Sequence, residues 1–294
     1  MLRSTCRYIV AACSLLCVFA TAQTTEPAIN GLSLNAVLMR LQVRRWEYLR
    51  NVPDFFADET VASEMRGTGI PYIHILSESI FRLRRSTAPG TFPPNLVETR
   101  TLRSNNGSPV PPASPLAGPA ILINAFSNGL TTIALDQKPC YDFRISPHRD
   151  VHHARVFAID YRMKPGAATT SVCVPWQDVS GQAIVDAATF SILQFVMHVP
   201  RYPVAPGIIG VWQWSIDFAP VVFDGRTFSM PRHIASYSES LDGRYFWTYS
   251  ASYRNYHKTG VRSRIITNLG DDDIETPAPP DAAQKPLAQS PQRR

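Results

Sequence analysis

Strict alternation of apolar and polar side chains near residue 215 is the feature that most constrains the fold of this 294-residue chain. The apolar positions are Trp212, Trp214, Ile216 and Phe218, separated by Gln213, Ser215 and Asp217. Because successive side chains of a β-strand point to opposite faces, this pattern predicts a strand with one buried and one solvated face. A second run predicts a longer strand of the same kind. Its apolar positions are Tyr245, Trp247, Tyr249, Ala251 and Tyr253.

Weaker runs of the same period, bounded by turn-forming residues, predict strands along most of the chain. They cover residues 55–65, 73–84, 96–103, 140–145, 156–163, 182–199 (two strands with a turn at 186–188), 221–223, 226–230 and 261–267. Asp224-Gly225 and Asp242-Gly243 are typical of tight hairpin turns. About ten to twelve strands with few helices between them favour hairpin connections over a parallel sheet. We therefore expect a mainly β (β-rich α+β) fold: a large curved antiparallel sheet or open half-barrel, in one domain over residues 33–269.

Two segments show helical spacing instead. Over residues 33–50, apolar side chains recur on one face of a helix, which predicts an amphipathic N-terminal helix. Pro53 ends it, because the residue before a proline is pushed out of the helical region. A short second helix is expected within residues 120–135, where Asn128-Gly129 weakens the pattern. Both helices would cover one face of the sheet.

The first 22 residues have the three parts of a secretory signal peptide. Arg3 and Arg7 give a basic start, an apolar run extends over residues 8–19, and Ala20-Thr21-Ala22 supplies a cleavage site. The apolar run is shorter than the roughly 20 residues of a membrane-spanning helix. An uncleaved anchor, or lipid attachment at Cys13, are the alternatives. We expect residues 1–22 to be removed and the mature chain to contain no transmembrane span.

The two ends of the mature chain are expected to remain outside the folded domain. Residues 23–32 form a short flexible lead, and residues 270–294 form a tail rich in proline, alanine and glutamine, which cannot bury enough apolar surface to fold. The predicted signal peptide implies that the mature protein is exported to the periplasm or the outer envelope, or is secreted further.

Export also bears on the cysteines and on the charge. Three of the five cysteines lie in the signal peptide, so Cys140 and Cys173 remain, either joined as a disulfide in an oxidising compartment or as two separate buried thiols. Removing Arg3 and Arg7 from 29 basic residues leaves 27, which against 23 acidic residues gives a mature net charge of +4. This charge is modest and scattered, so nucleic acid is not an expected partner.

The sequence contains no nucleophile elbow, phosphate loop, zinc-protease helix or calcium loop. The best metal-ligating candidates are His148, Asp150, His152 and His153. Imidazole and carboxylate groups together can hold zinc, but the same segment is also typical of a polar loop between two strands. No cofactor is predicted, and a metal-assisted enzyme is the least favoured of three hypotheses.

Aromatic residues are the more informative candidates. Seven of them occupy alternate strand positions: Trp212, Trp214, Phe218, Tyr245, Trp247, Tyr249 and Tyr253. They form either an ordinary sheet core or, in part, the lining of an apolar groove for a lipid or similar ligand, since a sheet covered by helices can enclose such a cavity.

The segment Gly181-Gln182-Ala183-Ile184-Val185-Asp186-Ala187-Ala188-Thr189 resembles a hairpin of the outer-membrane lipoprotein carrier and sorting superfamily, in which a glycine leads a strand into an Asp-x-x-Thr turn. The chain also resembles a set of uncharacterised exported bacterial proteins. The shared segments are Val52-Pro53-Asp54-Phe55-Phe56 with Asp58-Glu59, Asp224-Gly225-Arg226-Thr227-Phe228, and Tyr253-Arg254-Asn255-Tyr256. Ala57 stands where such relatives often carry cysteine, so no cysteine-based role is carried over. The resemblance implies an open β half-barrel with helical lids that shields acyl chains.

Two main hypotheses result. The first is an exported carrier that binds a lipid or a lipidated protein in an apolar groove. The second is a non-enzymatic envelope module with a filled core, which contacts an envelope protein.

Overall fold

The structure is a computed structural model that describes residues 31–86, 96–122, 125–128, 130–147, 155–170 and 173–260. The chain up to Thr259 belongs to one compact unit. The predicted signal peptide, most of the flexible lead, the strand at 261–267 and the tail at 270–294 lie outside the described residues.

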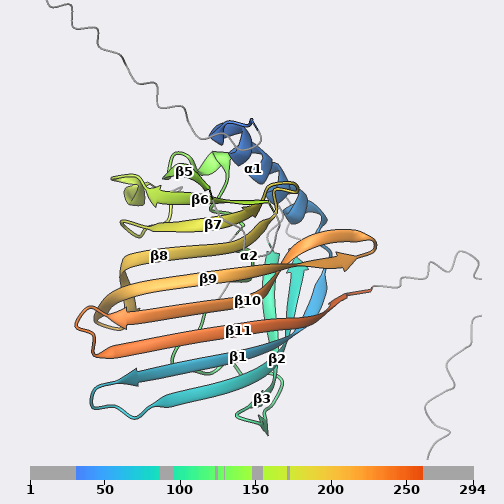
Figure 1. The fold of residues 1–294 in the computed structure, drawn as a ribbon. Coiled ribbons are helices and arrows are strands. Elements are labelled where there is room, and N and C mark those ends of the chain that lie inside the picture. The colour runs from blue at the N-terminus through green and yellow to red at the C-terminus, as the bar shows by residue number, and fades with distance from the viewer. Residues whose placement is uncertain are drawn as a thin grey trace, which may run out of the picture. The chain divides into compact units, whose positions relative to one another are not determined.

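Eleven strands form one antiparallel sheet (Figure 1). They are β1 (Phe55–Gly67), β2 (Ile73–Arg85), β3 (Leu96–Asn105), β4 (Ser108–Pro109), β5 (Tyr141–Pro147), β6 (Val156–Met163), β7 (Ser180–Asp186), β8 (Ile192–Ala205), β9 (Ile208–Phe223), β10 (Arg226–Ser240) and β11 (Tyr245–Lys258). Their order in the sheet is β4-β3-β2-β1-β11-β10-β9-β8-β7-β6-β5. Strands that follow one another in the chain are neighbours in the sheet, except β4 and β5, which form its two edges. The first and last strands, β1 and β11, pair with each other in the middle of the sheet. The expected open antiparallel sheet is therefore confirmed.

Strand β9 is longer than the sequence pattern predicts. The runs at 212–218 and 221–223 belong to one strand, although Pro220 lies between them. Strand β8 pairs with β9 only as far as Asp217. Pro220 therefore sits where β9 has no neighbour on that side, which is where a sheet tolerates a residue without an N–H.

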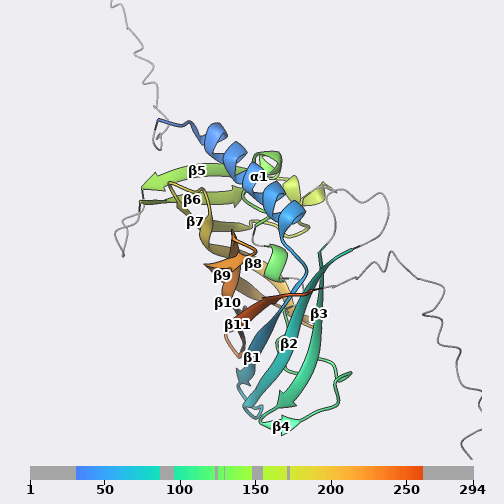
Figure 2. The ribbon, with the colours of Figure 1, turned by 90° about the vertical axis from the view of Figure 1, so that its right-hand side faces the viewer.

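Tight turns join neighbouring strands at Asp224-Gly225, as the sequence predicts, and at Asn106-Gly107. Asn106 and Asp224 have φ values of 48° and 49°, and each is followed by a glycine with positive φ. Two consecutive residues in the left-handed region form the turn whose twist matches a β-hairpin. The sheet twists strongly from one end to the other, so that β5–β7 run across the direction of β1–β3 (Figure 2).

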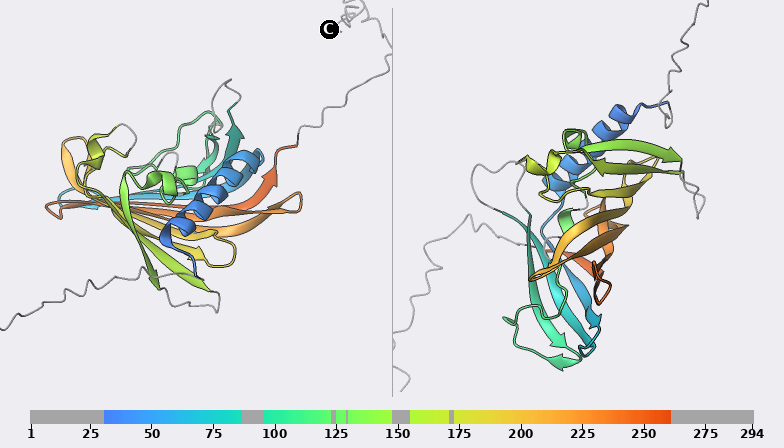
Figure 3. Two further views of the ribbon diagram at one scale, coloured as in Figure 1. Left: turned by 90° about the horizontal axis from the view of Figure 1, so that it is seen from above. Right: turned by 90° about the vertical axis from the view of Figure 1, so that its left-hand side faces the viewer.

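Helix α1 (Leu34–Asn51) begins at Ser33, whose hydroxyl accepts a hydrogen bond from the amide of Ala36 at 3.4 Å, and it ends at Val52 before Pro53. It lies across one face of the sheet (Figure 3). Its buried residues are Val37, Leu38, Leu41 and Tyr48. The predicted amphipathic helix is thus confirmed, with a serine cap that satisfies one of its free amides.

The second helix is shorter than predicted. Of residues 120–135, only α2 (Ala125–Asn128) is helical, and single 3₁₀ turns follow at η1 (Leu135–Gln137) and later at η2 (Ala167–Thr169). Phe126 and Ile133 are nevertheless completely buried. Their apolar spacing reflects burial against the sheet, which an irregular segment achieves as well as a helix.

Candidate functional site

Six of the seven predicted groove residues are buried on the covered face of the sheet: Trp212, Trp214, Phe218, Trp247, Tyr249 and Tyr253. Tyr245 is half-buried. Much of this surface is packed ring against ring. Trp214 lies 5.3 Å from Phe195 and 6.0 Å from Trp212 between ring centroids, and Trp176 closes over Trp212 at 5.3 Å.

Three of these residues also line a cavity, which we call the tryptophan cavity. It has a volume of about 230 Å³ and is lined by Pro119, Ala120, Ile121, Leu122, Tyr202, Pro203, Val204, Trp212, Ser236, Ser238, Trp247 and Tyr249. The indole N–H of Trp212 donates to Ser236 Oγ at 2.8 Å, which fixes the ring at the edge of the hollow. Tyr245 lines a different cavity, beside the β8–β9 turn. Ligand binding by the seven aromatic residues stays a prediction.

A second hollow, which we call the helix groove, lies beneath α1. Its volume is about 260 Å³, and it is lined by Leu41, Arg44, Arg45, Glu47, Tyr48, Asn51, Leu130, Phe190, Ser191, Ile192, Arg226, Thr227, Phe228 and Ser229. One wall is the helix, and the others are the β7–β8 turn and the start of β10. Apolar side chains from four separate segments meet here: Leu41, Tyr48, Leu130, Phe190, Ile192 and Phe228.

A neighbouring cavity of about 360 Å³ lies near the tip of the β9–β10 hairpin. The two cavities share Asn51, Arg226 and Phe228 as lining residues, so they adjoin each other at the C-terminal end of α1.

The Asp-x-x-Thr turn shapes one wall of the groove. Asp186 Oδ1 accepts hydrogen bonds from the amide of Thr189 at 2.7 Å and from its hydroxyl at 2.8 Å. Burial tends to raise the pKa of Asp186, but these hydrogen bonds outweigh it and lower the pKa. The turn projects Phe190, whose φ is 57°, towards α1, where the guanidinium of Arg40 lies 4.8 Å from its ring centroid. The carbonyl of Thr189 accepts from Arg44 Nε at 3.0 Å, which ties the turn to the helix.

Tyr48 places a buried hydroxyl beside this hollow. Among the described residues the hydroxyl has no hydrogen-bond partner. Burial, helped by the negative charge of Glu98, raises the pKa of Tyr48, so the phenol stays protonated. A buried hydroxyl without a partner costs about 1–3 kcal/mol, which a bound polar group would recover.

Sequence reasoning missed most of the groove. Phe190, Ile192 and Phe228 fell within predicted strands, and Phe228 also within a segment of the resemblance, but no pattern marked any of them as a groove residue. The usable signals were indirect: the amphipathic helix over 33–50, correctly expected to cover the sheet, and the Asp-x-x-Thr turn. Leu130 comes from the segment at 120–135, the other expected cover.

The predicted metal candidates His148, Asp150, His152 and His153 lie outside the described residues. Within the part of the chain that the structure describes, no group of three or more histidine, cysteine, aspartate or glutamate residues could hold a metal ion.

One catalytic-looking set occurs on the opposite face of the sheet. His233 Nε2 lies 2.9 Å from Ser250 Oγ, and His233 Nδ1 lies 3.6 Å from Asp217 Oδ2, too far for a hydrogen bond. Ser250 pairs with Ala62 on one side and Ala235 on the other, so its amide belongs to the ladder. An acyl-transfer site needs free donors for an oxyanion, and the surrounding strand amides are occupied. We interpret the set as part of the polar outer face.

Cys140 and Cys173 form a disulfide, with their Cα atoms 5.5 Å apart. The bond ties the start of β5 to the segment that precedes β7. The prediction that the two remaining cysteines are joined agrees with this geometry.

No helix among the described residues is both long enough and apolar enough to cross a membrane.

No protein-family model matches the chain, and no curated protein matches it in sequence. Solved structures similar to it include a LolA superfamily protein from Nitrosomonas europaea, with 12% identity, 78% of this chain and 95% of that chain covered, and a TM-score of 0.31. A putative outer membrane lipoprotein-sorting protein domain from Vibrio parahaemolyticus has 10% identity, 76% and 93% coverage, and a TM-score of 0.34. A DUF1329 family protein from Desulfovibrio piger has 9% identity, 76% and 93% coverage, and a TM-score of 0.31. The fold assignment itself rests on the strand order and pairing described above.

Proposed function

We propose that this protein is an exported envelope protein that binds a lipid, or the acyl chain of a lipidated protein, in the helix groove. The observation that carries the proposal is the hollow between α1 and the sheet. Its apolar lining is contributed by four separate segments, and a second cavity adjoins it at Phe228. Close packing normally fills such spaces, so a hollow held open by surrounding hydrogen bonds is suited to a ligand.

Two further features support a hydrophobic ligand. The Asp186–Thr189 turn and its bond to Arg44 hold the wall in place without filling the space. The sequence resemblance to lipoprotein carriers points to the same ligand class. Binding is expected to need no enzyme chemistry, because enclosure alone shields an acyl chain from water.

The test is to purify the chain natively, extract it, and identify bound lipid by mass spectrometry. Phe228 is half-buried in the groove, so Phe228→Glu puts a charge in the ligand path at small cost to the fold. Val222, on the other strand of the same hairpin and 63% exposed, gives the matched control Val222→Glu.

Lipid present in the parent and in Val222→Glu, but lost from a folded Phe228→Glu, would establish the groove. Lipid retained by Phe228→Glu and lost on replacing Trp247 by glutamate would move the site to the tryptophan cavity. A stable protein that carries no lipid and binds no uncharged fluorescent apolar probe would overturn the proposal and favour the envelope interaction module. Export itself is tested by expressing the full chain and sequencing its N-terminus, which should begin at Gln23.

A further inference from the structure

The charged side chains around the helix groove are mostly cationic. The lining of the groove and of the adjoining cavity contains four basic residues and two acidic ones: Arg44, Arg45, Arg226, Lys258, Glu47 and Asp224. The difference, 4 − 2 = +2, makes the surroundings of the two cavities basic.

Three of the four cations have acidic partners. Arg44 pairs with Glu47 at 2.8 Å, Arg45 pairs with Asp136, and Lys258 pairs with Asp224. Among the described residues, Arg226 forms no ion pair and no side-chain hydrogen bond. The basic character of the path therefore concentrates in one guanidinium.

The position of Arg226 matches a ligand head group. It is the first residue of β10, it is exposed, and it lines both cavities. Two residues along the strand, Phe228 lies half-buried between the same cavities. A planar guanidinium with five donors thus stands where the apolar path meets solvent, an arrangement suited to a carboxylate or a phosphate.

We propose that the ligand of the helix groove is an amphiphile with an anionic head group, a carboxylate or a phosphate, which binds Arg226 while its apolar chain lies beneath α1. This inference rests on the proposed function and adds the charge class of the ligand. An uncharged or cationic amphiphile of the same chain length gains no charge-assisted hydrogen bond from Arg226 and binds more weakly.

The experiment compares four probes with one dodecyl chain each: dodecanoate, dodecyl phosphate, dodecanol and dodecyltrimethylammonium. Affinities are measured by displacement of an uncharged fluorescent apolar probe from the purified chain, below the micelle concentration of each amphiphile. We expect each of the two anions to bind at least about tenfold more tightly than dodecanol, because one charge-assisted hydrogen bond contributes enough free energy for such a difference. The stronger of the two anions identifies the head-group chemistry.

Variants of the same strand provide the control. Arg226→Gln should abolish the preference for the two anions over dodecanol, whereas Arg226→Lys should keep part of that preference. Arg232→Gln, at another exposed arginine of β10, should change nothing. Equal binding of all four probes, or an anion preference that survives in Arg226→Gln, would overturn the head-group assignment while the groove stands. Failure of all four probes to bind would overturn both the assignment and the proposed function.

Discussion

The covered face of the sheet contains two regions lined by aromatic and aliphatic side chains. One region is filled by these side chains, and the other leaves a hollow. The aromatic core, defined by Phe55, Phe81, Phe126 and Tyr253, is filled ring against ring. Phe81 and Phe126 lie 4.6 Å apart between centroids, and Tyr253 meets each of them edge-on at 5.3 Å and 5.1 Å. The helix groove, beneath the C-terminal half of α1, leaves a hollow of about 260 Å³.

The difference lies in how the walls are fixed. The aromatic core is closed by β1, β2, β11 and α2, whose side chains interlock. In the groove, the hydrogen bond from Arg44 to Thr189 fixes α1 to the β7–β8 turn at the rim. The side chains behind this contact do not fill the space between the helix and the sheet. A void forfeits dispersion contacts on its lining. The aromatic core therefore stabilises the fold, and we infer that the groove is kept for binding.

The largest effect we expect is in the aromatic core. Glu59 is 1% exposed, and it accepts hydrogen bonds from Arg100 Nε at 2.9 Å and from Ser79 Oγ at 2.6 Å. Burial alone would lower the pKa of Arg100, but the charge of Glu59, its hydrogen bond and the nearby Tyr253 and Tyr249 together raise it. Glu59→Gln removes the nearer of two carboxylates that compensate a mostly buried guanidinium, the other being Glu98 at 3.8 Å, and should lower the free energy of unfolding by up to about 3–5 kcal/mol in urea denaturation.

The triple variant Glu59→Gln, Glu98→Gln, Arg100→Met is the control, because it removes all three charges and should regain much of the loss. A single variant as stable as the parent would show that Glu98 alone compensates Arg100 and that this region tolerates the loss of a buried ion pair. The comparison between a tightly specified core and a permissive groove would then fail.

The disulfide should give the next largest effect. It closes a loop between residues 33 positions apart, which corresponds to about 3–4 kcal/mol in the loop-entropy model. Replacing both Cys140 and Cys173 by serine should lower the free energy of unfolding by that amount. It should also weaken the packing of Trp176 against Trp212. Tryptophan fluorescence should shift to longer wavelength, while lipid binding in the helix groove should persist. Loss of lipid in a protein that still folds would show that the two hollows are coupled.

Phe228→Ala should cost much less, about 1 kcal/mol, because the ring is only half-buried and already faces open space. Urea denaturation of lipid-free protein measures it. The same variant should weaken ligand binding more than it weakens the fold, which is the reverse of the pattern for Glu59→Gln. A loss of about 3 kcal/mol or more would instead place Phe228 in the structural core.

The sequence predicts the filled region better than the hollow one. Alternation over 245–253 places Trp247, Tyr249 and Tyr253 on the buried face, and the structure confirms their burial, because the strand period depends only on local geometry. The helix groove depends on how α1 packs against a turn 145 positions later in the chain, as the hydrogen bond from Arg44 to Thr189 shows. No local pattern encodes that distance. The helix expected within residues 120–135 extends only over Ala125–Asn128 for a related reason: burial against the sheet produced helical spacing beyond the helix itself.

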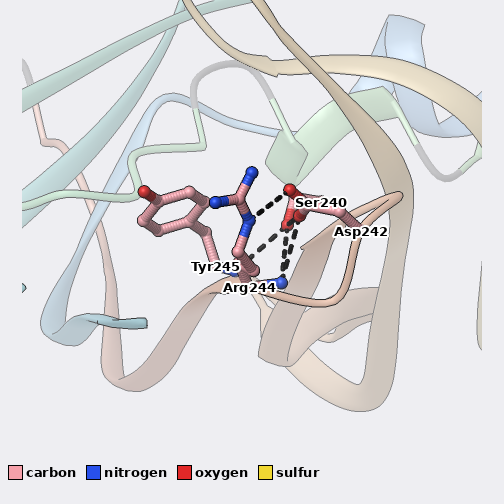
Figure 4. A network of polar contacts seen from close by, with 4 residues as sticks. All are labelled: Ser240, Asp242, Arg244 and Tyr245. Carbon is pink, nitrogen blue, oxygen red and sulfur yellow. Dashed lines mark hydrogen bonds and ion pairs between the residues drawn. The ribbon is translucent and has the colours of Figure 1, made fainter. Parts of the chain in front are cut away.

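The smallest effect that we expect is in the β10–β11 hairpin. Strand β10 begins at the helix groove, and β11 contributes Tyr253 to the aromatic core. Asp242 there accepts hydrogen bonds from Ser240 Oγ at 2.6 Å and from Arg244 Nε at 2.6 Å (Figure 4). These bonds, that from Ser240 first, lower the pKa of Asp242 to about 2. Since the pKa in the unfolded chain is about 3.9, the stabilisation is complete above pH 4 and disappears as the pH falls towards 2.

Asp242→Asn should therefore be slightly less stable than the parent at neutral pH, and the difference should vanish near pH 2. Chemical denaturation at several pH values measures this difference in stability. The carbon NMR signal of the Asp242 carboxyl should report a pKa of about 2. Because the hairpin lies at the far end of both strands from the helix groove, ligand affinity should be the same in the two proteins across this range. A ligand affinity that followed the Asp242 titration would show that β10 transmits the state of the hairpin to Arg226, and that the hollow and filled regions are not independent.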